Sequence, residues 1–193
     1  MQNLPPTNPG DELAIIAAVR EEFVNADATG TPVENYAKNI RANIMRGNGL
    51  FITGDVGVGK TYTACACVIA AIREGCSAKY LTGGQIIRQM IGAITAGSSE
   101  EAVLNKITRT SLLVVDDLGR EGTTAKTLSR LFDVINERTS RKKATIYTTN
   151  YTPAELVKQW SETGDRKTAQ AIVSRIAGST KKIEMYGDDR RLG

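Results

Sequence analysis

Residues 49–61 read GLFITGDVGVGKT, an apolar run that leads into a glycine-rich loop. The pattern G-x-x-x-x-G-K-[ST] is matched here by Gly54, Asp55, Val56, Gly57, Val58, Gly59, Lys60 and Thr61. Glycines let such a loop curl so that its backbone N–H groups point at phosphate oxygens, and the following helix adds its positive dipole end. We expect Lys60 to reach the β- and γ-phosphates of a nucleotide and the Thr61 hydroxyl to bind Mg²⁺.

A second apolar run, residues 112–115, ends in two carboxylates, Asp116 and Asp117. A nucleotide-binding protein needs a buried strand ending in a carboxylate opposite its phosphate loop. We expect Asp116 to hold Mg²⁺ and Asp117 to polarise the water that attacks the nucleotide. Outside this context, such a pair is often only a strand followed by a helix cap.

A third apolar run, residues 146–149, ends in Asn150. In a strand beside the first two, Asn150 lies close to the γ-phosphate and can orient the attacking water. The alternative is that Asn150 only begins the turn into the next helix. That helix is predicted at Thr152, where Thr152-Pro153-Ala154-Glu155 forms a capping box with proline at the first helical position.

Short apolar runs alternate with helical segments along the rest of the chain. The expected strands are 49–53, 78–82, 111–115, 144–149 and 182–186. The expected helices are 60–74, 85–96, 100–108, 124–138, 153–160 and 168–177. The clearest of them carries the apolar stripe Leu128, Leu131, Phe132 and Ile135. This alternation predicts an α/β fold with a parallel sheet and helices on both faces.

The first 33 residues are predicted to form an arm ahead of a core that spans residues 34–193. Residues 1–10 are rich in proline and asparagine and are typical of a disordered tail. Residues 11–26 show helical spacing, with Leu13, Ile16, Ala17 and Val24 on one side. Gly30, Thr31 and Pro32 then end the helix.

Composition narrows the classes of function. The chain has 193 residues, 41% hydrophobic and 24% charged, with a formal net charge of +4, which is too small to indicate a nucleic-acid partner by itself. It has no histidine, which excludes Ser-His-Asp and Cys-His triads and histidine-ligated zinc. Its three cysteines, Cys65, Cys67 and Cys76, form no CxxC pair and no plausible disulfide framework, which indicates a reducing compartment. Cys65 and Cys67 are expected to be small buried residues of a helix. No signal peptide or membrane-spanning run is visible, so we expect a cytoplasmic protein without membrane contact.

Five stretches, taken in order and spacing, carry a resemblance to a known family: GLFITGDVGVGKTYTA, LLVVDDLGREGTT, LFDVINERTSRKKATIYTTN, AIVSRIAG and IEMYGDDRRLG. From about Glu34 to the C-terminus, the chain resembles the helicase-loader and transposition-helper branch of the AAA+ ATPases, the DnaC/DnaI/IstB-like group. The resemblance implies a P-loop NTPase of AAA+ (ASCE) type with a five-stranded sheet in the order 5-1-4-3-2. It also implies a helical insertion between the second and third strands, and a homo-oligomer with ATP at its subunit interfaces.

The resemblance also assigns roles to late residues. In that family an arginine of a late helix reaches the γ-phosphate of the neighbouring subunit, and the matching residue here is Arg175, within AIVSRIAG. A planar cation stabilises the charge that builds on a transferring phosphoryl group. Without the motif, Arg175 would be taken for a solvated helix residue. Gly187, Asp189 and Arg191 match the closing G-x-D-x-R of the family, for which the sequence indicates no role.

The chain departs from the family pattern in two places. Asp117 is one methylene shorter than the glutamate common among AAA+ enzymes, which bears on the rate of hydrolysis more than on binding. Helicase loaders of this group carry a helicase-binding domain ahead of the ATPase core, whereas only about 33 residues precede the core here. The chain is therefore expected to be either a fragment or a short form with a different partner contact.

Two basic clusters are candidates for contact with a nucleic-acid backbone: Arg88, Lys106 and Arg109 in the insertion, and Arg138, Arg141, Lys142 and Lys143 before a strand. Either could equally be a solvated face. No sequence-reading motif is visible, so any contact is expected to be with phosphates.

The leading hypothesis is a Mg²⁺-dependent ATPase that loads a replicative DNA helicase onto single-stranded DNA. The alternatives are a transposition helper ATPase that binds duplex DNA and a transposase, and a switch that binds ATP but scarcely hydrolyses it. A GTPase is disfavoured because the guanine-reading N-K-x-D is absent: Asn105 and Lys106 are followed by Ile107 and Thr108. A small-molecule kinase would need an arginine-rich lid and an acceptor pocket, and the pair of Asp116 and Asp117 with Asn150 fits hydrolysis better.

Overall fold

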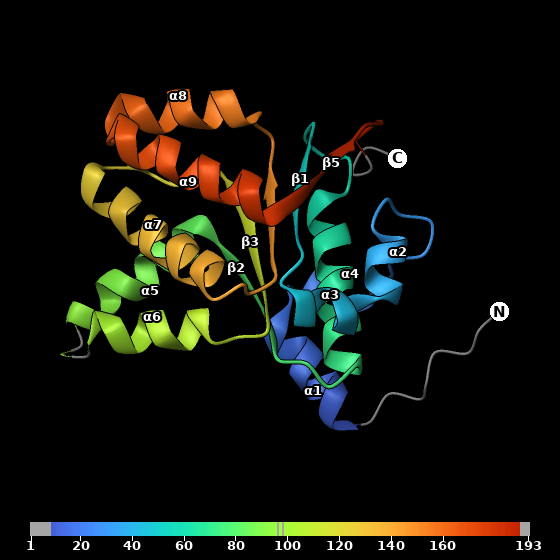
Figure 1. Cartoon of the computed structure of the whole chain (residues 1–193). Coiled ribbons are helices and arrows are strands. Elements are labelled where there is room, and N and C mark those ends of the chain that lie inside the picture. Colours follow the sequence, from blue (N-terminus) through green and yellow to red (C-terminus); the bar gives the residue numbers. More distant parts are fainter. Residues whose placement is uncertain (1–8, 96, 98, 190–193) are drawn as a thin grey trace.

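The computed structural model describes residues 9–95, 97 and 99–189, which form a central sheet covered by helices on both faces (Figure 1). The sheet has five parallel strands: β1 (Gly49–Gly54), β2 (Ala78–Thr82), β3 (Leu112–Leu118), β4 (Thr145–Thr149) and β5 (Thr180–Met185). Their order is β2-β3-β4-β1-β5, which is the expected order 5-1-4-3-2 counted from the other edge. The chain therefore has the predicted α/β fold of the AAA+ type.

Alternate residues of the central strands pack into two separate cores, one on each side of the sheet. Leu50, Ile52 and Val114 pack on one side, and Phe51 and Val115 on the other. Because both faces are covered, β1 and β3 are apolar over most of their length, which is why they read as continuous apolar runs.

The helices divide between the two faces (Figure 1). One face carries α1 (Pro9–Ala18), α2 (Glu34–Lys38), α3 (Ile40–Arg46) and α4 (Lys60–Arg73). The other carries α5 (Gly83–Thr95), α6 (Glu100–Thr108), α7 (Ala125–Ser140), α8 (Pro153–Thr163) and α9 (Arg166–Ser179). The helices α5 and α6 form the expected insertion between the second and third strands. No helix within the described ranges is both long enough and apolar enough to span a membrane.

The cap predicted for α8 is present: the Thr152 hydroxyl accepts the N–H of Glu155, and the Glu155 carboxylate accepts the N–H of Thr152. The stripe predicted for α7 is also buried, with Leu128, Leu131 and Ile135 fully covered and Phe132 partly covered.

The N-terminal helix differs from the prediction in both length and orientation. It ends at Ala18, Arg20 is extended, and a 3₁₀ turn follows at Glu21–Phe23. Ile15 and Val19 face the core, whereas Leu13 and Ile16 are 72% and 60% exposed. The predicted stripe was wrong because it relied on Val24, which lies beyond the end of the helix. The tail predicted over residues 1–10 lies outside the described residues, except that Pro9 and Gly10 begin α1.

Two short helices were not among those predicted. The helices α2 and α3 have 5 and 7 residues, too few for an apolar repeat to stand out.

Candidate nucleotide-binding site

The carboxyl ends of β1, β3 and β4 meet at a pocket of about 610 Å³. In an open parallel sheet this edge is where ligands bind. Eight of the residues singled out in the sequence line the pocket: Val56, Gly57, Gly59, Lys60, Thr61, Asp116, Asp117 and Asn150. The three strands therefore bring together the motifs that the sequence places about 55 and 90 residues apart.

The phosphate loop links β1 to α4 and is tied together by its own lysine. The Lys60 ammonium is buried and donates to the carbonyl oxygens of Gly54 (2.8 Å) and Asp55 (2.6 Å). Gly57 and Gly59 have φ angles of +82° and +96°, a conformation that favours glycine. Val58 is buried between them and anchors the loop to the core. Gly54, Asp55 and Val58 thus shape the loop, while the other five members of the motif line the pocket.

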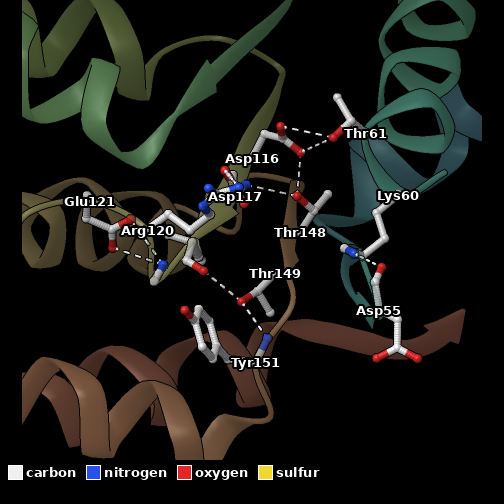
Figure 2. A network of polar contacts seen from close by, with 12 residues as sticks. Asp55, Lys60, Thr61, Asp116, Asp117, Arg120, Glu121, Thr148, Thr149 and Tyr151 are labelled. Atoms are coloured by element: carbon white, nitrogen blue, oxygen red, sulfur yellow. Dashed lines mark hydrogen bonds and ion pairs between the residues drawn. The ribbon is translucent and has the colours of Figure 1, made fainter. Parts of the chain in front are cut away.

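Asp116 is held by three hydroxyl groups that come from three different elements. Figure 2 shows two of these contacts, those of Thr61 and Thr148. The Thr61 hydroxyl of α4 donates to its carboxylate at 3.1 Å, and the Tyr80 hydroxyl of β2 donates at 2.6 Å. The third donor is the Thr148 hydroxyl of β4. Burial, followed by the nearby Asp116 charge, raises the pKa of Tyr80, so this phenol stays protonated and remains a donor. The carboxylate is therefore fixed beside the phosphate loop.

Asp117 owes its direction to an irregularity in β3. The register with β4 shifts between Val115 and Leu118, and Asp117 has a φ angle of +58°. Neighbouring side chains of a regular strand point to opposite faces, but this bulge lets Asp116 and Asp117 both line the pocket. The Asp117 N–H donates to Thr148 Oγ1 at 3.0 Å, and the Asp117 carboxylate lies 3.6 Å from the Arg120 guanidinium.

The end of β4 contributes more than the asparagine predicted from the sequence. Asn150 lines the pocket directly after the strand, and Thr149 donates to the Leu118 carbonyl (2.7 Å), which fixes the end of β3 against β4. Thr148, Tyr80 and Arg120 were not identified in the sequence, because an isolated threonine, tyrosine or arginine carries no motif.

A buried carboxylate supports the loop that follows β3. Glu121 accepts hydrogen bonds from the Gly119 N–H (3.0 Å) and the Trp160 indole N–H (3.0 Å). Burial raises its pKa, and these donors act in the opposite direction. The hydrogen bond from Trp160 ties the loop carrying Arg120 to α8.

Part of the pocket wall comes from the N-terminal segment. Arg20, Glu22 and Phe23 line the pocket, and the Phe23 ring meets Tyr62 edge-on with the ring centroids 6.2 Å apart. The Tyr62 hydroxyl in turn accepts the Asp27 N–H at 3.1 Å. The sequence did not reveal this wall, since it depends on packing against α4 rather than on a local pattern.

Arg175 does not line the pocket of its own chain. It lies on α9 against α7, where its Nε donates to Asn136 Oδ1 (2.7 Å) and its guanidinium stacks over the Phe132 ring, 4.6 Å from the centroid. Asp189, from the closing G-x-D-x-R motif, lies against the phosphate loop. A Cβ built on Gly57 would fall 1.9 Å from Asp189 Oδ1. Arg191 lies outside the described residues.

The oxygen ligands at the base of the pocket fit a magnesium ion that arrives with phosphates. Mg²⁺ prefers hard oxygen donors and is usually held by one or two carboxylates, water and substrate phosphates. The Thr61 hydroxyl and the Asp116 carboxylate supply this minimal set. No group of three His, Cys, Asp or Glu residues that could hold a metal without phosphates occurs in the described part of the chain.

Comparison with known proteins agrees with this geometry. The family model described as IstB-like ATP binding protein matches residues 35–193. The replicative helicase loader DnaI of Bacillus subtilis (strain 168) is 26% identical over 151 residues, 76% of this chain and 48% of the relative. The insertion sequence IS1162 protein of Pseudomonas fluorescens is 33% identical over 105 residues, 54% of this chain and 45% of the relative. The replicative helicase loader DnaC of Escherichia coli (strain K12) is 28% identical over 131 residues, 67% of this chain and 51% of the relative. The chain thus spans about half the length of these curated relatives.

Solved structures share the fold. A crystal structure of the DnaC helicase loader superposes with a TM-score of 0.69 at 22% identity and covers 86% of this chain and 99% of that chain. The replication initiator DnaA bound to AMPPCP and single-stranded DNA gives a TM-score of 0.64 at 21% identity, covering 83% of this chain and 48% of that chain.

Proposed function

Because the chain belongs to the IstB-like ATP-binding protein family, we propose that it hydrolyses ATP with Mg²⁺ and uses ATP to load a replicative helicase onto single-stranded DNA. It is an ATP-binding AAA+ protein related both to helicase loaders and to the ATPases of insertion sequences. The observation that supports hydrolysis is the fixed position of Asp116 between Thr61, Tyr80 and Thr148, directly beside the loop that carries Lys60.

The pocket residues divide the chemistry between them. We expect the backbone N–H groups of the loop and the Lys60 ammonium to bind the phosphates. Mg²⁺ held by Thr61 and Asp116 would neutralise phosphate charge and polarise the phosphoryl group. Asp117 is the candidate base for the attacking water, and Asn150 would orient that water.

We propose that Arg175 completes the pocket of a neighbouring subunit. It lies on α9, outside the pocket of its own chain, and is held in a defined position by Asn136 and Phe132. In this proposal the protein is a homo-oligomer with ATP between subunits, and an isolated subunit hydrolyses ATP slowly.

The division into an arm of residues 1–33 and a core of residues 34–193 also remains a proposal. The contribution of Arg20 and Phe23 to the pocket supports an arm that takes part in nucleotide binding. For a protein that acts on chromosomal DNA, we expect a cytoplasmic location.

The second candidate is a transposition helper that binds duplex DNA and a transposase. It is favoured by the 33% identity to the IS1162 protein, above the 26% to DnaI. A slow ATP switch is the third, and the contact of Asp117 with Arg120 favours it, because an ion pair with a guanidinium makes a carboxylate a weaker acceptor for a proton from water.

A capture experiment separates these roles. The immobilised chain is incubated with ATP or ADP and then with a purified replicative helicase, single-stranded DNA or duplex DNA. Retention of helicase with ATP, lost in Lys60→Ala, supports the loader. Retention of duplex DNA with no helicase supports the transposition helper, and retention of neither with ATP contradicts both.

A further inference from the structure

A second hollow, of about 570 Å³, lies at the amino ends of the strands, at the opposite end of the sheet from the nucleotide pocket. Its walls come from the end of α3, the start of β1, the turn between α7 and β4, and the passage from α9 into β5. No residue of this hollow takes part in the nucleotide site described above.

The hollow gathers positive charge. Arg46, Lys142, Lys143 and Lys181 line it, and no aspartate or glutamate does. None of these four forms an ion pair within the described ranges, whereas Arg20, Lys38, Arg120, Arg130, Arg141 and Lys182 each lie within 4 Å of a carboxylate. Four uncompensated cations around one depression concentrate a positive potential there.

The structure divides the basic cluster that precedes β4. Arg138 is fully buried and donates to Thr145 Oγ1 (2.8 Å) and to three carbonyl oxygens, so it is a structural residue and unable to meet an external phosphate. Arg141 pairs with Glu137. Only Lys142 and Lys143 of the cluster reach the hollow, where they join two cations distant in sequence.

The turn that presents these lysines is held in an unfavourable conformation. Lys142 has a φ angle of +50°, which costs a residue with a side chain on the order of 1 kcal/mol. Glycine would avoid this strain at the end of a helix. The turn also packs closely on the end of α3, since a Cβ on Gly47 would fall 2.3 Å from the Lys142 carbonyl oxygen. The backbone of Lys142 is thereby held against Gly47, the residue that follows Arg46, and both cations line the hollow.

The helix ends around the floor of the hollow make it unfavourable for a small anion. Three helices, α3, α7 and α9, end around it, and the end of a helix carries partial negative charge on its free carbonyl groups. A small phosphate on this floor would meet carbonyl oxygens. An extended chain of phosphates lying across the rim would meet the lysine and arginine side chains instead.

We infer that this hollow is a docking site for the phosphodiester backbone of DNA, contacted by Arg46, Lys142, Lys143 and Lys181. The inference rests on the proposed action on DNA but not on ATP hydrolysis. It makes the two ends of the sheet separate sites, with nucleotide at the carboxyl end and DNA at the amino end. Binding here is independent of base sequence, because contacts to phosphates carry no base information.

The test measures the salt dependence of DNA binding. Fluorescence anisotropy of a labelled oligo(dT) strand, and of a labelled duplex, is recorded without nucleotide over a range of NaCl concentrations. The wild type is compared with Arg46→Gln/Lys142→Gln/Lys143→Gln/Lys181→Gln. Each phosphate contact on a single strand contributes about 0.7 to the slope of log K against log[salt], so the variant is expected to lose about 3 from the slope and on the order of 10²-fold in affinity at ~0.1 M salt.

The matched control removes four exposed cations elsewhere: Lys126→Gln/Lys158→Gln/Arg166→Gln/Lys167→Gln on α7, α8 and α9. It carries the same net charge as the first variant and is expected to retain the wild-type slope. Equal losses in both variants would mean that net charge alone attracts DNA, and would overturn the site. A hollow variant that binds like wild type but melts at a lower temperature would show that these cations serve only the helix ends.

Three further measurements complete the test. The double variant Lys143→Gln/Lys181→Gln is expected to show about half of the decrease in salt slope that the quadruple variant shows. It replaces the quadruple variant if that fails to fold. Inorganic phosphate should displace DNA no better than NaCl of equal ionic strength; selective displacement would indicate a small-anion site instead. Because DNA binding is also measured in Lys60→Ala, a failure of the ATPase proposal leaves this result unchanged, whereas a wild type that binds neither DNA overturns the inference.

Discussion

The Thr148 hydroxyl donates a hydrogen bond to the Asp116 carboxylate and accepts one from the backbone N–H of Asp117. One side chain of β4 therefore fixes both acidic residues at the end of β3. It does so from a buried position between the two strands.

We predict that Thr148→Val impairs hydrolysis more than nucleotide binding. Valine keeps the shape but removes the hydroxyl oxygen that accepts the Asp117 N–H, at a cost of about 1–3 kcal/mol, and removes one donor from Asp116. The measurement is ATP turnover together with the affinity for a fluorescent ATP analogue. Thr148→Ser, which keeps the hydroxyl, should retain most activity; a serine variant as impaired as the valine one would contradict the role of the hydrogen bonds.

Asp117→Asn should keep ATP affinity and lose most turnover, because only the transition state needs the negative charge. Single-turnover kinetics with wild type and variant provide the comparison. Equal rates would remove Asp117 from the catalytic residues and favour the slow switch.

For Arg175 the decisive measurement is complementation. Arg175→Ala keeps an intact pocket, whereas Lys60→Ala keeps the arginine but has a disabled pocket. If Arg175 acts on the neighbouring subunit, a mixture of the two should recover activity that neither has alone. Sedimentation confirms assembly, and an assembled mixture no more active than its parts would make Arg175 a surface arginine.

Thiol reactivity should distinguish the three cysteines. Burial raises the pKa of Cys65 and of Cys67 to about 12, so both remain protonated and unreactive at pH 8, while Cys76 is partly exposed. A chromogenic disulfide reagent is expected to titrate one thiol in the native protein and three in urea. Cys76→Ser should abolish the native reaction, and rapid labelling of three native thiols would contradict the packing of α4.

Arg138→Met should destabilise the fold by about 3 kcal/mol, because it removes the guanidinium donors to the buried carbonyl oxygens of Thr108 and Ala144 and to the Thr145 hydroxyl. Urea unfolding followed by circular dichroism measures the loss. The exposed Arg141→Met provides the control and should change stability by less than about 1 kcal/mol.

The sequence predicted the sheet and the centre of the site because those features are local. The phosphate loop and the acidic and amide strand ends are contiguous motifs, and the order of parallel strands places them at one edge. The rest depends on distant contacts. Tyr80 reaches Asp116 from a strand 36 residues earlier, and Arg20 reaches the pocket only because the segment after α1 packs on α4.

The burial of charged side chains was the property that the sequence predicted least well. In sequence, Arg138 is indistinguishable from Lys142, yet the first is enclosed by carbonyl groups and the second faces solvent. Burial of a long cation is decided by which backbone acceptors happen to surround it. The N-terminal stripe failed for a different reason, since it relied on Val24, which lies beyond the end of α1 at Ala18.

The Asp189 carboxylate, from the segment after β5, lies against Gly57 of the phosphate loop. A loop exposed to solvent normally accepts many substitutions, and the neighbouring Val56, 55% exposed, has that freedom. Gly57 does not: any side chain would collide with the Asp189 carboxylate, and even a shorter residue at 189 would leave the left-handed backbone unsuited to a Cβ. A larger residue at position 57 would therefore require the Asp189 side chain to move and would still leave a side chain on a left-handed backbone, so two separate constraints keep glycine at the tip of the phosphate loop.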